Sequence, residues 1–334
     1  MRKSIGLKGN SAKAAILVLL VALVSMFHFL IPTEPHTSHK VHIILRKLYF
    51  LPPVMAAAWF GLRGAVWTTS IVSIAFTIHA FLDWPGNYME QANQLGELAS
   101  FWVVGLVPGW LFDRQRSLMA KVARANEETL VALVSALDMR ERNTRLHSQR
   151  VRDYTLLLAD RFGVPEEARS VIGLGALLHD VGKIAVPDSI LLKPGGLSDD
   201  EWEEMRRHPD EGYRLLQRID FLRDAAQIVH AHHERFDGSG YPRGLKGEEI
   251  PVGSRLFAVA DAFDALTSNR PYHSAEGYEE AARVIRGKSG RDFDPAVVEV
   301  FRKVEPKEWM KIMERYPENG DGPSLLNASQ SADA

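Results

Sequence analysis

The chain contains no cysteine, and this absence excludes several kinds of site at once. Without thiols there is no disulfide, no thiolate nucleophile, no cysteine-ligated zinc and no iron–sulfur cluster. Any metal ion must therefore be held by nitrogen and oxygen ligands. Twelve histidines are available for this role, five within residues 1–112 and seven in the remainder of the chain.

The chain also lacks a large net charge, since 40 basic and 42 acidic residues leave it at −2. No concentrated basic stretch is present, so the sequence predicts no nucleic-acid partner. The charges are unevenly distributed: residues 1–112 hold only 12 of them, whereas residues 113–334 hold 70. We therefore expect an apolar N-terminal region and a hydrophilic C-terminal region with different surroundings.

Four nearly uncharged segments in the apolar region predict about four transmembrane spans, at 14–31, 48–62, 64–82 and 98–112. The first is an 18-residue run, about the minimum length for a spanning helix. A cleaved signal peptide is an alternative, but no A-x-A site follows and more apolar segments come after. We expect residues 1–112 to form a transmembrane anchoring or sensory region; a soluble domain with buried helices is less favoured.

Basic residues near the ends of these segments predict their orientation. Four precede the first span, Arg63 lies in the tight turn between the second and third, and several follow the fourth. The polar loop expected at 32–47 disagrees, because it carries three basic residues. On balance we expect both termini to be cytoplasmic, with the protein in the cytoplasmic (inner) membrane.

Residues 113–137 contain neither glycine nor proline and predict an unbroken helix after the last span. Apolar residues recur there every seven positions, but the seam is weak because alanine and threonine occupy core positions. We interpret it as a signal helix that forms a homodimer; a simple amphipathic linker is the alternative.

The rest of the chain is expected to be helical, which makes the fold class all-α. Beyond residue 130 apolar residues recur at helical spacing, and no convincing period-two strand is present. Ser198 with Glu201 forms a capping box, and Gly163 separates two predicted helices. Residues 315–334 are polar and are expected to be a disordered tail.

Three motifs in this hydrophilic region carry chemistry: LHDVGK at 178–183, HHERFDGSGYP at 232–242 and DAFDALTSNRPY at 261–272. His179 and Asp180 are adjacent, so their side chains leave a helix in different directions. One therefore cannot replace the other, but both can reach one metal ion. Asp261 and Asp264 share one face of an apolar helix, which is costly unless they are paired or bind a cation.

Other polar residues indicate a functional site only when they are considered together with the three motifs. His147 and His208 alone would more often be surface or capping residues. Glu234 and Asp237 could orient the histidine pair at 232 and 233 from outside the ligand set, or they could hydrogen-bond the backbone of their own loop. Residue types alone do not decide between these two roles.

The motifs together resemble the HD-GYP domain, the cyclic di-GMP phosphodiesterase branch of the HD phosphohydrolases. The resemblance covers residues from about 130 to 310 and rests on the three motifs, the PDSILLKPG loop and the H-x-x-x-G at His208 to Gly212. It implies a helical bundle around a metal centre, with iron or manganese as the preferred ions.

The resemblance also implies a role for each matching residue. His147, His179, Asp180 and Asp261 would hold one metal ion, and His208, His232 and His233 the other, with Asp180 bridging the two. Some members of the family have a glutamate four residues before the first ligand histidine and bind three metals. Here that position is Asn143, a poor ligand, so we predict two divalent ions.

The same resemblance implies that Lys183 and Arg270 meet the substrate phosphates and that Tyr241 and Asp264 line the nucleotide pocket. Asp180 and Lys183 would act in hydrolysis of the 3′,5′-phosphodiester to pGpG, and a further cut would give GMP, by attack of a hydroxide that bridges two metals. Two alternatives stay open: a low-turnover module that docks a GGDEF-domain partner through the Gly-Tyr-Pro loop, and a hydrolase of another cyclic dinucleotide.

Overall fold

The computed structural model describes residues 2–31, 36–83, 88–140, 146–268 and 275–316. Helices account for the regular structure of these residues, and their only extended pairing is an isolated bridge between Ser289 and Phe293. The expected all-α fold is therefore confirmed. The chain divides into two compact units, residues 1–125 and 126–334, with the boundary inside one helix.

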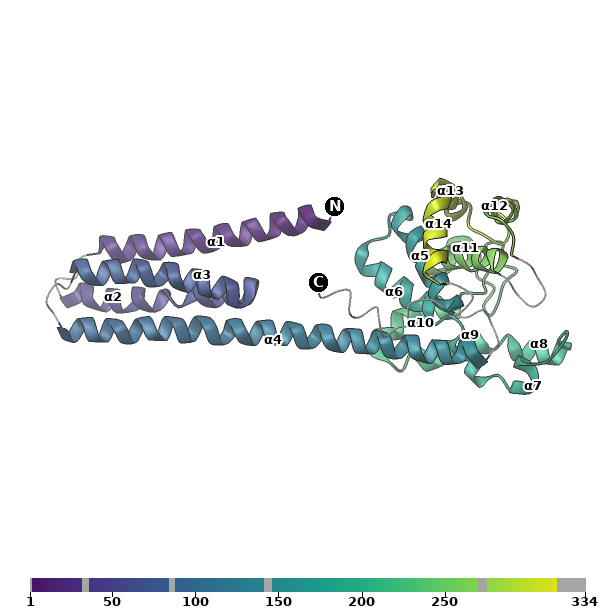
Figure 1. Ribbon diagram of the computed structural model, residues 1–334, viewed down its shortest axis with the longest axis horizontal. Helices are drawn as coiled ribbons and strands as arrows, with labels where there is room; N and C mark the ends of the chain where they lie inside the picture. Colours follow the sequence, from purple (N-terminus) through teal and green to yellow (C-terminus); the bar gives the residue numbers. More distant parts are fainter. Residues whose placement is uncertain (1, 32–35, 84–87, 141–145, 269–274, 317–334) are drawn as a thin grey trace. The chain divides into compact units, whose positions relative to one another are not determined.

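The first unit is built from long helices that run alongside one another (Figure 1). They are α1 (Arg2–Leu30), α2 (His36–Leu48), α3 (Leu51–Asp83) and the first part of α4 (Tyr88–Arg140). The loop expected at 32–47 is wrong from His36 onward, because this segment forms α2. The third expected span and most of the second lie in α3.

A break at Gly61 divides α3 into two arms. Its φ of 68° lies in the left-handed region, which glycine adopts without a steric penalty. Tyr49, just before α3, packs edge-on against Phe76 in the second arm, with 6.1 Å between ring centroids. The chain therefore reverses direction near Gly61, where the sequence predicted a turn.

Three helical segments of the described residues are long and apolar enough to cross a membrane: Asn10–Leu30, Ile43–Leu82 and Leu95–Arg140. The middle one is 40 residues long and contains the break at Gly61. Large apolar side chains on these helices are exposed, for example Trp67 at 73% and Phe81 at 70%. An apolar surface of this extent is typical of a membrane-facing protein.

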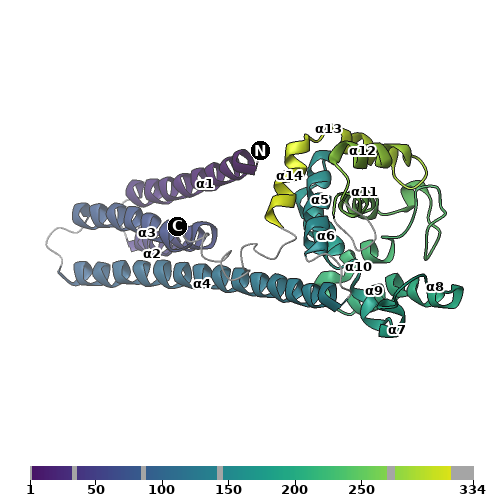
Figure 2. The same ribbon diagram turned by 45° about the vertical axis from the view of Figure 1, so that its right-hand side comes forward.

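The second unit consists of shorter helices (Figure 2). They are the end of α4, α5 (His147–Phe162), α6 (Glu166–Leu177), η1 (Val181–Ala185), α7 (Asp188–Leu191), α8 (Asp199–Met205), α9 (His208–Leu216), η2 (Asp220–Leu222), α10 (Arg223–His230), η3 (Gly247–Glu249), α11 (Val252–Thr267), α12 (Tyr278–Gly287), α13 (Pro295–Lys303) and α14 (Pro306–Arg315). The predicted capping box at Ser198 is present, and α5 ends at Gly163, whose φ is 88°.

Two apolar clusters hold this unit together. The larger lies between α5 and α11 and extends to α13 and α14, where Phe263 packs on Trp309 with 4.6 Å between ring centroids. The smaller joins Val131 and Val134 of α4 to the ends of α6, α9 and α10. The compact body continues to Tyr316, whose hydroxyl donates to Asp153, and the expected tail from residue 317 lies outside the described residues.

Candidate metal centre

Packing of five helices brings together side chains from distant parts of the sequence. His147 opens α5, Asp261 lies on α11, and His179 and Asp180 follow α6. His208 opens α9, and His232 and His233 follow α10. The described residues contain two groups whose ligand atoms lie within 4.8 Å of one another: His147, His179 and Asp180 form one, and Asp180, His208, His232 and His233 form the other. Asp180 belongs to both.

Three of these histidines have the same backbone anchor. The Nδ1 of His179 lies 2.8 Å from the Ala176 carbonyl oxygen, and the equivalent distances are 2.8 Å from His208 to Met205 and 2.5 Å from His232 to Val229. Each ring thus donates Nδ1–H to the residue three positions earlier. This bond selects one tautomer and leaves Nε2 with its lone pair available for a metal ion.

The ring nitrogens crowd one another in a way that suits a cation. Nε2 of His208 and Nε2 of His232 are 3.1 Å apart, and Asp180 Oδ1 lies 3.4 Å and 3.8 Å from them. Two imidazole lone pairs and a carboxylate oxygen repel one another unless a positive ion lies between them. Buried nitrogen and oxygen donors of this kind suit a divalent transition metal, so the residues fit the metal that the motifs imply.

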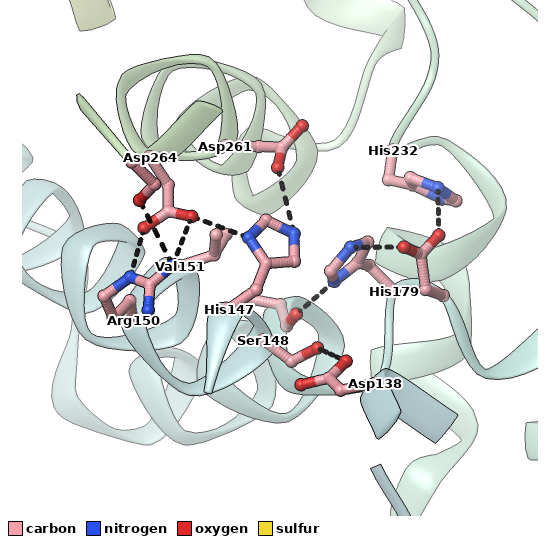
Figure 3. A network of polar contacts seen from close by, with 12 residues as sticks. Asp138, His147, Ser148, Arg150, Val151, His179, His232, Asp261 and Asp264 are labelled. Carbon is pink, nitrogen blue, oxygen red and sulfur yellow. Dashed lines mark hydrogen bonds and ion pairs between the residues drawn. The ribbon is translucent and has the colours of Figure 1, made fainter. Parts of the chain in front are cut away.

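His147 is held by a carboxylate instead of a carbonyl (Figure 3). Its Nδ1 lies 2.7 Å from Asp264, while its Nε2 lies 3.5 Å from Asp261 on the other side of the ring. Asp264 is completely buried and accepts two further bonds from Arg150, at 2.6 Å and 3.1 Å. The structure thus places Asp264 inside the bundle, where it orients a ring and has no surface to line a nucleotide pocket.

The end of α4 reaches the same region. Ser148, next to the predicted ligand His147, donates its hydroxyl to Asp138 at 2.9 Å (Figure 3). Burial, partly offset by this bond, raises the pKa of Asp138. Arg140 donates to the carbonyl oxygens of Lys183 and Val186, and so fixes the segment that follows Asp180. The end of α4 therefore contacts both the helix that carries His147 and the segment that follows Asp180.

The pKa shifts in the site leave most of the expected ligand histidines neutral, which is the form that binds a metal ion. Burial lowers the pKa of His208, His232 and His233, the last to about 3, so these rings are neutral at physiological pH. Burial also acts to lower the pKa of His179, but the charge and hydrogen bond of Asp180 outweigh it and raise the value to about 9. Without metal, one proton thus remains between His179 and Asp180.

The Gly-Tyr-Pro loop is built by its own side chains. Glu234 accepts from the backbone N–H groups of Arg243 and Leu245, at 2.8 Å and 3.0 Å, and Asp237 accepts from Ser239. Of the two roles left open by the sequence, the structure therefore favours backbone support. Tyr241 stacks on His233, with 4.7 Å between ring centroids and 26° between planes.

Of the two expected phosphate-binding residues, Lys183 lies among the described residues and Arg270 does not. Lys183 lies beside the centre, with Nζ 2.7 Å from Asp180 Oδ2. Arg270 lies outside the described residues, as does Asn143, the position on which the expected number of metals depends. His230, outside the motif pattern, forms a structural contact: its Nε2 is 2.7 Å from Asp210, and its ring stacks on Tyr213.

Comparison with known proteins agrees with this arrangement. The family model described as HD domain matches residues 132–297. These residues are thus similar to an HD domain. The match spans all seven expected ligands, from His147 to Asp261, including Asp180, which belongs to both ligand groups.

Curated relatives cover the same region of the chain. The cyclic di-GMP phosphodiesterase response regulator RpfG of Xanthomonas campestris is 44% identical over 57% of this chain and 51% of its own length. A cyclic di-GMP phosphodiesterase of Thermotoga maritima is 45% identical over 61% and 55%. A 3′3′-cGAMP-specific phosphodiesterase of Vibrio cholerae is 39% identical over 55% and 36%. The chain thus spans about half the length of the first two relatives and about a third of the third.

Sequence reasoning missed Arg150, although a signal was present. Arg150 lies on α5 three residues after His147 and four before Tyr154, in line with the apolar positions of that helix. A charged residue in such a stripe requires a buried partner. Its partner, Asp264, is 114 residues away, so only the fold could identify it.

Proposed function

We propose that the chain is a metal-dependent phosphodiesterase that hydrolyses cyclic di-GMP to pGpG, with GMP as the product of a second cut. The observation that carries this proposal is the pair of ligand groups that share Asp180, with three imidazoles fixed in the metal-binding tautomer. The relatives named as cyclic di-GMP phosphodiesterases support the choice of substrate.

The expected ligand set would hold two divalent ions, iron or manganese, with Asp180 between them. When bound, such ions act as Lewis acids that activate water and polarise a phosphoryl group. The remaining residues act on the substrate and on the ligands. Asp264 and Arg150 keep His147 in place, and the cationic Lys183 offsets the negative charge that grows on the phosphoryl oxygens.

Two further residues belong to the proposed substrate site. Arg270 would share the phosphate charge with Lys183, as the motif resemblance implies. Tyr241 offers an aromatic ring beside the ligand His233, where it can contact the nucleotide. Burial raises its pKa to about 12, with a further contribution from Asp180, so its hydroxyl stays protonated and can donate a hydrogen bond.

For the apolar region we propose a multi-pass anchor in the cytoplasmic membrane, with the HD domain in the cytoplasm. The three apolar helical segments support a membrane location, and the break at Gly61 supports counting the middle one as two spans, four in all. Residues 113–137 would form the dimer seam. A signal received in the apolar region would then reach the centre through Asp138 and Arg140.

A second substrate is favoured by one observation, because three of the curated relatives are named 3′3′-cGAMP-specific phosphodiesterases. Cyclic GMP-AMP differs from cyclic di-GMP only in one base and has the same type of phosphodiester. The metal centre alone would not distinguish the two, so any preference must come from contacts with the bases.

The test uses the full chain in detergent micelles, loaded with iron(II) or manganese under reducing conditions. Cyclic di-GMP, 3′3′-cGAMP and their products are followed by chromatography, with Asp180→Ala as the inactive control. We expect pGpG from cyclic di-GMP only with the wild-type chain. Equal product from both chains would refute hydrolysis and leave the alternative of a binding module that docks a GGDEF-domain partner.

A further inference from the structure

A column of four flat groups leads outward from the candidate metal centre. The ligand ring of His233 stacks on Tyr241, and the Arg206 guanidinium carbon lies 5.6 Å from the centroid of the Tyr241 ring. The same carbon lies 5.8 Å from the ring of Trp202, which is 45% exposed. The Arg206 guanidinium therefore contacts two aromatic rings, one of which stacks on a predicted ligand.

The backbone fixes Arg206 relative to the metal ligands. Arg206 terminates α8, and two positions later His208 begins the ligand-bearing helix α9. The carbonyl of the preceding residue, Met205, accepts the Nδ1–H of His208. The predicted ligand His208 is thus bonded to the residue next to Arg206, which fixes the backbone of Arg206 relative to the centre.

No acidic side chain neutralises Arg206 in the described part of the chain. Its neighbour Arg207, equally on the surface, pairs with Glu204 at 2.9 Å and with Glu203 at 3.8 Å. Aromatic rings hold a guanidinium by its faces and leave the N–H groups at its edge available. That edge can form two parallel hydrogen bonds with a flat pair of acceptors.

We infer that Arg206 binds the guanine base of the substrate and so selects guanine over adenine. Guanine offers O6 and N7 as adjacent acceptors, which match the fork of an arginine, whereas adenine has an amino group in place of O6. A base one ribose away from the bound phosphodiester would reach the outer part of the column. This inference rests on the proposed function, because it assumes a cyclic dinucleotide at the metal centre.

The test compares Arg206→Ala and Arg206→Lys with the matched control Arg207→Ala in the full metal-loaded chain. For each, kcat/KM is measured with cyclic di-GMP, with cyclic di-AMP and with bis(p-nitrophenyl) phosphate, which has no base. We expect both Arg206 variants to lose about 5- to 100-fold with cyclic di-GMP only, the range typical of one two-bond guanine contact. Arg207→Ala should match the wild type on all three substrates.

The other outcomes separate the two proposals. Unchanged cyclic di-GMP hydrolysis in Arg206→Ala would overturn the inference and leave the proposed function standing. Equal losses with cyclic di-GMP and cyclic di-AMP would also overturn it, since the guanidinium would then bind phosphate. A wild-type chain that cleaves bis(p-nitrophenyl) phosphate but no cyclic dinucleotide would refute the proposed function and the inference together.

Discussion

The buried ion pair between Arg150 and Asp264 gives the sharpest prediction about stability. Arg150 is 1% exposed and Asp264 0%, and Arg150→Met would leave the carboxylate buried with His147 as its remaining partner. Loss of one member of a buried pair typically costs about 3–5 kcal/mol. Burial alone would raise the pKa of Asp264, but His147 and Arg150 hold it at about 2, so its ionisation contributes about 2–3 kcal/mol at neutral pH.

The assay is urea unfolding of the full chain in micelles, followed by circular dichroism. We expect Arg150→Met to lower the free energy of unfolding by about 3 kcal/mol, against under about 1 kcal/mol for Arg161→Met, which removes a surface pair with Glu308. The contribution of Asp264 is complete above about pH 4 and lost as the pH falls towards 2. The difference between wild type and Arg150→Met should therefore shrink on acidification, and a loss equal to that of Arg161→Met at pH 7 would refute the reasoning.

Three further predictions concern the centre. Gly182→Ala should lower the metal content, measured by mass spectrometry, because the added Cβ would lie 1.9 Å from the His208 carbonyl oxygen. The control Gly196→Ala should leave the metal content unchanged, because its added Cβ would have no atom of a non-neighbouring residue within 4 Å. Manganese affinity should rise about tenfold per pH unit up to about pH 9, because the raised pKa of His179 means that metal binding releases its proton. Calorimetry in two buffers measures this released proton. Lys183→Met should lower kcat about 100-fold in the chromatographic assay, with metal content unchanged.

The sequence predicted the parts of the centre that have a chemical signature. An aspartate on an apolar helix face is conspicuous, so Asp261 could be singled out from the pattern, whereas His147 could be named only through the resemblance to the HD-GYP domain. The partner of each residue could not be predicted. Asp261 and Asp264 lie three residues apart on one helix face, yet one lies beside the outer side of a ligand ring and the other is buried against Arg150.

The apolar region was harder to predict for a different reason. Hydropathy identifies segments that can be buried in lipid but does not locate helix ends, because a helix can continue beyond its apolar segment. Thus α4 runs without interruption from Tyr88 to Arg140, through Pro108 and past the expected end of the span at 112. Conversely, the break inside α3 required a residue that tolerates a positive φ, and Gly61 marked that position in the sequence.

We propose that the hydrolysis requires two ions, which Asp180 and the six other expected ligands would hold. This proposal is tested most directly by titrating manganese into the metal-free full chain and measuring pGpG formation from cyclic di-GMP at each step. We expect little product up to one ion per chain and a rise in rate that is complete at two. Full activity at one ion, a plateau only at three, or no product at any ratio would refute the two-ion proposal.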